Sequence, residues 1–239
     1  MRKFLMPLVS ALALIAFIWP LWTASAGLES ELAGAMSVLA IAGLALASIF
    51  LLDGELLGPK QIALLGMLSA LGASLRVATG GTGGFELVFV TIILGGAVFG
   101  SRFGFLLGLT TIALSSLFFA GLGPWTAYQM FASAWLGAGA GLVSRRFGKS
   151  LIALGGYAVV ASYGFGLVMN LWFWPFAVGP LTSISFNQAA SLAENVVSFL
   201  SYSLVSSTLT WDTVRAISVA AVILVFGKPL IRTLERAKV

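Results

Sequence analysis

Few residues of this chain could do chemistry. The 239 residues include no cysteine and no histidine, and only 9% of them are charged. Disulfide bonds, thiolate or imidazole metal sites, and catalytic triads with a histidine base are therefore excluded. No complete Walker A motif is present to bind a nucleotide phosphate. The sequence predicts a protein that is not an enzyme and that holds no metal and no cofactor.

Arg76 and Glu86 are the charged residues most suited to a site. They flank the glycine-rich run 80–84, which could fold back and bring the two charges together. An arginine at mid-membrane costs roughly 2.5–3.5 kcal/mol on insertion scales, so Arg76 is tolerable at the membrane interface or opposite a partner. We expect a structural ion pair between Arg76 and Glu86, with direct substrate contact as the alternative.

Amides and aromatic rings gather near the same ends of the predicted helices. This inventory suits a bulky organic ligand that bears amides or rings, although interface aromatics and loop capping would use the same residue types. The candidate substrate-binding residues are Arg76, Glu86, Trp125, Tyr128, Gln129, Asn170, Trp172, Trp174, Asn195 and Tyr202.

The elements that carry these residues are apolar helices. Hydrophobic residues make up 59% of the chain, and its charged fraction lies far below the about 25% of soluble domains. Unbroken apolar runs of roughly 17–25 residues are typical of transmembrane helices and not of barrel strands. We predict an all-α, polytopic transmembrane bundle of about eight helices. The expected spans are 4–22, 32–52, 62–78, 85–100, 103–121, 125–143, 151–176 and 213–230.

Charge placement orients these spans, because lysine and arginine concentrate on the cytoplasmic side. Cations near the span ends fall on one side if the helices alternate, which predicts a multi-pass membrane protein with both termini cytoplasmic. The family resemblance described below implies that the membrane is a bacterial or archaeal plasma membrane. The half-polar stretch 189–207 is then an extracellular, re-entrant or lid-like helix. The first apolar run resembles a signal peptide but is long enough to stay as an uncleaved helix. The basic charge needs no nucleic-acid partner.

The chain divides into a plain N-terminal helix pair, 1–58, and a six-helix membrane domain, 59–239. Small residues spaced three or four apart along the first helix of the domain allow close approach of another helix. This predicted partner-docking face consists of Ala63, Gly66, Ser69, Ala70 and Ala73. Packing inside the bundle is the alternative reading.

Two stretches resemble the substrate-binding S component of energy-coupling factor (ECF) transporters. They are Gly95-Gly96-Ala97-Val98-Phe99-Gly100-Ser101-Arg102-Phe103-Gly104 and Gly123-Pro124-Trp125-Thr126-Ala127-Tyr128-Gln129-Met130. The pairs Trp211-Asp212 and Arg215-Ala216 are similar to the branch associated with cobalamin-type substrates. The resemblance covers about residues 60–238.

The resemblance implies a subunit that captures a vitamin or related micronutrient outside the cell, with a cobalamin-like substrate favoured. Such a subunit docks to a transmembrane T component and depends on two cytosolic ATPases. The family typically has alanines four residues apart on its docking helix, whereas this chain has the small pairs Gly66/Ala70 and Ser69/Ala73. The family does not account for the helix pair 1–58. A stand-alone secondary transporter or channel and a structural membrane subunit are the alternatives.

Overall fold

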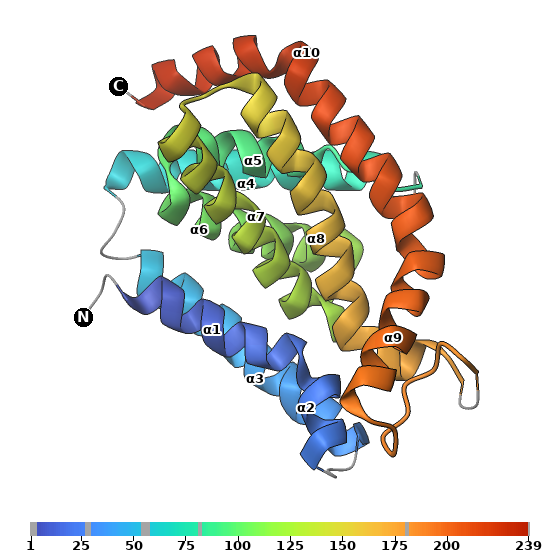
Figure 1. The fold of residues 1–239 in the computed structure, drawn as a ribbon. Helices are drawn as coiled ribbons and strands as arrows, with labels where there is room; N and C mark the ends of the chain where they lie inside the picture. The colour runs from blue at the N-terminus through green and yellow to red at the C-terminus, as the bar shows by residue number, and fades with distance from the viewer. Residues whose placement is uncertain (1–3, 27–29, 54–57, 81–82, 180–181, 239) are drawn as a thin grey trace.

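The computed structural model describes residues 4–26, 30–53, 58–80, 83–179 and 182–238, and these residues form helices and loops without a strand. The predicted all-α class is confirmed (Figure 1). Five described segments are long and apolar enough to cross a membrane, as expected of a membrane protein. They are Glu31–Ile49, Pro59–Thr79, Ser101–Phe118, Leu151–Ala177 and Leu192–Ala237.

The N-terminal part contains α1 (Leu5–Phe17), α2 (Trp19–Ala26) and α3 (Ser30–Asp53). The prediction of one continuous span over 4–22 is wrong, because the helix breaks at Ile18. Proline lacks an N–H group and its ring clashes with the carbonyl four residues earlier, so Pro20 is best accommodated in the first turn of a new helix. Helix α2 accordingly begins at Trp19.

The rest of the chain follows the predicted spans, with shifts of at most four residues at their ends except for the last helix, which runs eight residues beyond the predicted 230. It contains α4 (Pro59–Thr79), α5 (Val88–Phe99), α6 (Ser101–Ser115), the π-helix η2 (Ser116–Ala120), α7 (Trp125–Phe147), α8 (Leu151–Ala177), α9 (Leu192–Ser203), the π-helix η3 (Leu204–Asp212) and α10 (Thr213–Lys238).

We expected the stretch 189–207 to be an extracellular, re-entrant or lid-like helix. In the structure it starts in the loop before α9 and runs through α9 into η3. Helix α9 continues through η3 into α10 as one bent rod (Figure 1). The apolar segment Leu192–Ala237 has 46 residues, which at 1.5 Å per residue is about 69 Å. Because a hydrocarbon core is about 30 Å thick, much of this rod must lie outside it.

Glycines allow α5, α6 and α7 to pack with their backbones in contact. A Cβ atom placed on Gly137 of α7 would lie against the backbone of Gly104 in α6. The converse holds for Gly104, and Gly96 of α5 meets the backbone of Gly137 in the same way. No side chain can be accommodated there without moving a helix.

We therefore expect Gly137→Ala to lower the free energy of unfolding by about 1–3 kcal/mol, the usual cost of overpacking. The matched control is Gly66→Ala, at an exposed helical position where no atom lies within 4 Å of the added Cβ. Alanine favours a helix over glycine by about 1 kcal/mol, so this control should be neutral or stabilising. Thermal unfolding in detergent, followed by tryptophan fluorescence, compares the two. Equal stability of both variants would contradict the close backbone contact.

The N-terminal helices pack against the six-helix part rather than standing apart from it. Trp19 Nε1 donates to the carbonyl of Trp172 at 3.0 Å, and the hydroxyls of Ser37 and Tyr128 are 2.6 Å apart. Buried side chains of both parts belong to one apolar core. The described residues of the two parts are thus packed as one body, and the start of α1 and the end of α10 lie on the same side of it (Figure 1).

Candidate ligand-binding site

A polar cavity of about 360 Å³ lies where the helices of the six-helix part converge. Helices α4 to α8, the loop before α5 and the η3–α10 junction all contribute to its wall. Its lining combines charged groups with apolar and aromatic ones. The lining residues are Arg76, Thr79, Gly80, Gly84, Glu86, Val88, Phe89, Ile112, Gln129, Phe165, Met169, Trp211 and Arg215.

Arg76, half-buried near the end of α4, is held by uncharged oxygens. Its Nη1 donates to the hydroxyls of Ser115 at 2.6 Å and Ser116 at 3.3 Å, and its Nη2 donates to Gln129 Oε1 at 2.7 Å. The two serines lie where α6 passes into the π-helix η2, a local distortion that is frequent at functional sites. No carboxylate within the described ranges lies at ion-pair distance from Arg76.

The expected ion pair between Arg76 and Glu86 is therefore wrong. Glu86 Oε1 instead accepts from Arg215 Nη2 at 2.9 Å. Arg215 also donates from Nη1 to Asp212 Oδ1 at 2.7 Å, so one guanidinium lies between two carboxylates. Arg215 lies on the inner side of α10, where it meets the loop that carries Glu86. Glu86 is therefore paired with Arg215 and not with Arg76.

Arg215 is almost fully buried, with 6% of its surface exposed. Its guanidinium carbon lies 5.3 Å from the ring centre of Phe89 and 5.1 Å from that of Phe165. Cation–π contacts of this kind strengthen when water is excluded. The two rings and the two carboxylates fix Arg215 in one position in the cavity wall.

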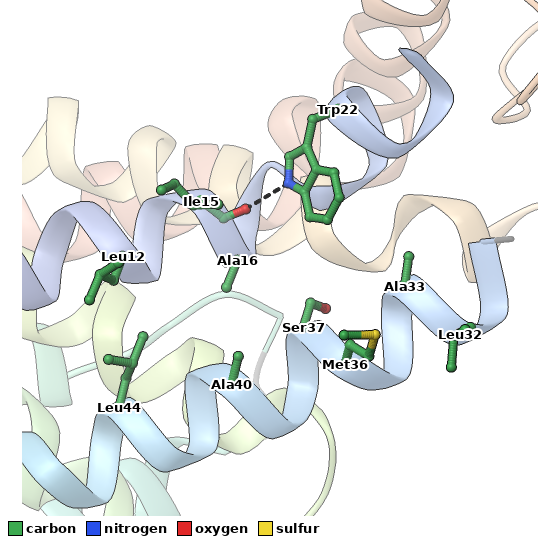
Figure 2. Close-up of a pocket in the computed structure, with 10 residues that line it drawn as sticks. All are labelled: Leu12, Ile15, Ala16, Trp22, Leu32, Ala33, Met36, Ser37, Ala40 and Leu44. Carbon is green, nitrogen blue, oxygen red and sulfur yellow. Dashed lines mark hydrogen bonds between the residues drawn. The ribbon is translucent and has the colours of Figure 1, made fainter. Parts of the chain in front are cut away.

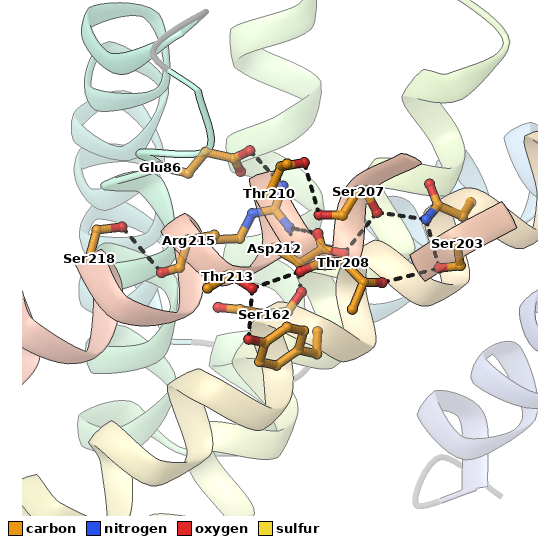
Figure 3. Close-up of polar contacts among 12 residues, drawn as sticks. Glu86, Ser162, Ser203, Ser207, Thr208, Thr210, Asp212, Thr213, Arg215 and Ser218 are labelled. Carbon is orange, nitrogen blue, oxygen red and sulfur yellow. Dashed lines mark hydrogen bonds and ion pairs between the residues drawn. The ribbon is translucent and has the colours of Figure 1, made fainter. Parts of the chain in front are cut away.

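A chain of hydrogen bonds leads from this cluster toward α9 (Figure 3). Ser207 donates to Asp212 Oδ2 at 2.8 Å, and Asn170 Nδ2 donates to Ser207 at 2.7 Å and to Ser203 at 2.9 Å. Asn170 thus contacts Asp212 indirectly, through the hydroxyl of Ser207, and does not line the cavity.

The loop that carries Glu86 is seated against η3 through Gly84. This glycine has a positive φ of 93°, and a Cβ at this position would collide with the backbone of Trp211. Only glycine combines this backbone conformation with so close an approach. The contact places both Glu86 and Trp211 at the cavity.

Only three of the predicted substrate-binding residues line the cavity, namely Arg76, Glu86 and Gln129. Tyr128 faces the N-terminal helices and stacks on Trp172, with ring centres 4.3 Å apart and planes 8° apart. Trp125, at the start of α7, is 44% exposed outside the lining.

The last three of the ten candidates lie around α9 and the loop before it. Trp174 and Tyr202 are buried in a separate apolar cluster beside Phe199. Asn195 binds the backbone of Asn187 through both ends of its amide, at 3.1 and 2.8 Å. All three stabilise the region around α9, and none lines the cavity.

The sequence interpretation missed the apolar wall, in particular Phe89, Phe165 and Met169. Trp211 and Arg215 were not among the predicted site residues and carried only the family resemblance. A signal for Arg215 was present, because a single arginine near the start of an apolar span is costly and marks a functional or paired position. The apolar lining residues gave no such signal, since in the sequence they cannot be distinguished from ordinary core residues.

The predicted docking face on α4 divides into two sets. Ser69 and Ala73 are buried, and the Ser69 hydroxyl lies 2.7 Å from that of Thr110 in α6. These two residues pack inside the bundle and cannot meet an external helix. Ala63, Gly66 and Ala70 are exposed.

A larger hollow of about 730 Å³ lies between α1 and α3 (Figure 2). Its lining is almost wholly apolar, and exposed side chains such as Ile15 and Met36 form its walls. The one side-chain hydroxyl in the lining, that of Ser37, is already bonded to Tyr128. With no free polar side chain to orient a ligand, this groove is a weaker candidate than the charged cavity.

The described residues contain no group of three or more side chains suited to hold a metal ion. Comparison with protein-family models, curated proteins and solved structures finds no match for this chain. Its function must therefore be inferred from the cavity itself.

Proposed function

We propose that this chain is the substrate-binding subunit of an ECF-type importer. In this proposal it captures a vitamin or related micronutrient from outside the cell and then docks to a T component that is driven by two cytosolic ATPases. The observation that carries the proposal is the charged cavity at which six helices converge. Ligand sites in helical membrane proteins are built at such convergences, and ionisable groups inside a bundle mark them.

The position of the cavity along the helices supports an external entrance. Arg76 and Ser115 lie near the ends of α4 and α6, whereas Arg102, Arg145 and Lys149 line a hollow at the opposite end of the bundle. Because cations concentrate on the cytoplasmic side, the ligand cavity lies toward the outside in this proposal.

The cavity volume bears on the size of the substrate. Ligand pockets are usually about 300–1,000 Å³, and 360 Å³ is at the small end of that range. A corrinoid macrocycle of the cobalamin type would need the cavity to open substantially, so we favour a smaller micronutrient. An importer subunit of this kind should bind its substrate tightly without ATP.

Gln129→Ala is expected to weaken ligand binding about 10-fold or more. The change removes the acceptor of a charge-assisted bond that positions Arg76, a loss of roughly 1.5–3 kcal/mol. Titration of the purified protein, followed by tryptophan fluorescence, measures the affinity. Gln61→Ala, an exposed amide near the other end of α4, is the matched control and should bind as the wild type does. Unchanged affinity in Gln129→Ala would remove this amide from the site.

Uptake measurements distinguish the proposal from a stand-alone transporter or channel. Cells that express the chain with and without a T component and its ATPases should accumulate the ligand only when all parts are present. Uptake into vesicles that contain this chain alone would contradict the ECF-type mechanism. Failure to bind any small molecule would instead favour a structural subunit.

A further inference from the structure

The charges of the cavity are distributed unevenly between two positions. Arg76 carries a positive charge and is bonded only to the neutral oxygens of Ser115, Ser116 and Gln129. Three bonds to neutral acceptors leave donor capacity on a guanidinium, which has five N–H groups. Arg76 is thus the group in the wall that most needs an anionic partner.

The second position has a surplus of negative charge. Glu86 and Asp212 both bind the single cation of Arg215, so this cluster carries one more negative than positive charge. Glu86 bonds to Arg215 through Oε1, and its side chain remains 32% exposed. Its carboxylate can therefore accept a further hydrogen bond from a ligand in the cavity.

These two positions are separate but share one cavity. Arg76 and Glu86 both line it, yet they do not form an ion pair with each other. The four charged groups sum to zero, so a ligand with only one charge would leave a net charge in a largely apolar bundle, at considerable cost. A ligand that carries one positive and one negative charge can pair with both Arg76 and Glu86, and it keeps the net charge of the cavity at zero.

We propose that the ligand is a small zwitterion, whose anionic group binds Arg76 and whose protonated nitrogen binds Glu86. Its apolar body lies against the wall formed by residues such as Ile112, Phe165 and Met169. This inference rests on the proposed function, because it names the substrate class of the same site.

The first experiment identifies what the protein binds. The purified full-length protein is denatured and the released small molecules are identified by mass spectrometry; in parallel, water-soluble vitamins and standard amino acids are added singly to ligand-free protein and scored by thermal shift. A ligand with both an acidic group and a basic nitrogen is expected. A bound ligand that lacks either group would overturn the zwitterion and leave the proposed function intact. Absence of any ligand in both arms would overturn the proposed function and this inference with it.

The second experiment tests the contact with Arg76 and compares the zwitterion so identified with its carboxyl amide. The wild type should bind the amide about 10- to 100-fold more weakly than the zwitterion, because a charge-assisted contact is lost. Arg76→Gln should bind the two compounds about equally, and Arg76→Lys should recover part of the preference. Arg145→Gln, an exposed cation at the other end of the bundle, should keep the full preference. A preference that survives in Arg76→Gln would overturn the assignment.

Discussion

Arg215→Met is expected to destabilise the protein by about 3–5 kcal/mol, the usual cost of removing one partner from a buried ion pair. The change would leave Asp212, which is 1% exposed, and Glu86 without their cation. It would also remove the contacts with the rings of Phe89 and Phe165. Since folded proteins are stable by only about 5–15 kcal/mol, much of the chain should unfold or aggregate on extraction. Size-exclusion profiles and thermal unfolding in detergent measure this loss.

A neutralised variant separates lost charge balance from lost packing. Glu86→Gln and Asp212→Asn, combined with Arg215→Met, remove all three charges of the cluster at similar volume. Most of the lost stability should return, because no buried charge is left without a partner. Arg102→Met, at an exposed position, should have little effect. A single Arg215→Met variant as stable as the wild type would show that the cluster contributes nothing to the fold.

Gly66→Leu combined with Ala70→Leu is expected to reduce ATP-dependent uptake to background while leaving ligand binding intact. Both positions are exposed on α4, and no atom lies within 4 Å of a Cβ added to Gly66, so the fold has room for the larger side chains. Close approach of two membrane helices depends on small residues, and two leucines would hold a partner helix away. Transport of radiolabelled ligand and affinity of the purified variant are measured together.

Gly156→Leu is the matched control, since Gly156 is an exposed glycine of α8 that also has no atom within 4 Å. It should transport normally. Normal uptake by the α4 variant would place the partner on another surface. A parallel loss of binding would show instead that the exposed face of α4 supports the cavity.

The fold class and most helix positions could be predicted because length and hydropathy determine them directly. Pro20 gave a signal for the break at Ile18, since proline disfavours a helix interior. The signal is not decisive, because Pro175 and Pro229 lie inside α8 and α10. The continuity of α9 through η3 could not be predicted. Its serines, threonines and Asp212 look like a polar loop in sequence, whereas in the structure Ser207 and Asp212 bond to each other within the wall of the bundle.

The cavity was harder to predict because the helices are apolar on most sides and carry little information on which face is buried. Tyr128 and Gln129 illustrate the difficulty. Adjacent helical residues point about 100° apart, so Gln129 faces the cavity while Tyr128 packs on Trp172 and Ser37. Glu86 pairs with Arg215 instead of Arg76. Arg215 lies more than 100 positions from both residues in the sequence, and no local pattern predicts this pairing.

The backbone contacts among α5, α6 and α7 have a mechanical consequence. Helices joined through Gly96, Gly104 and Gly137 cannot slide past one another without collision, so these three helices should move as a rigid block. Gln129 and Ile112, which belong to that block, then form a fixed half of the cavity wall. In the proposed function, admission and release of a ligand would fall to the other half. There the segment 83–87 is held to η3 by the close approach of Gly84 to Trp211 and to α10 by the ion pair between Glu86 and Arg215.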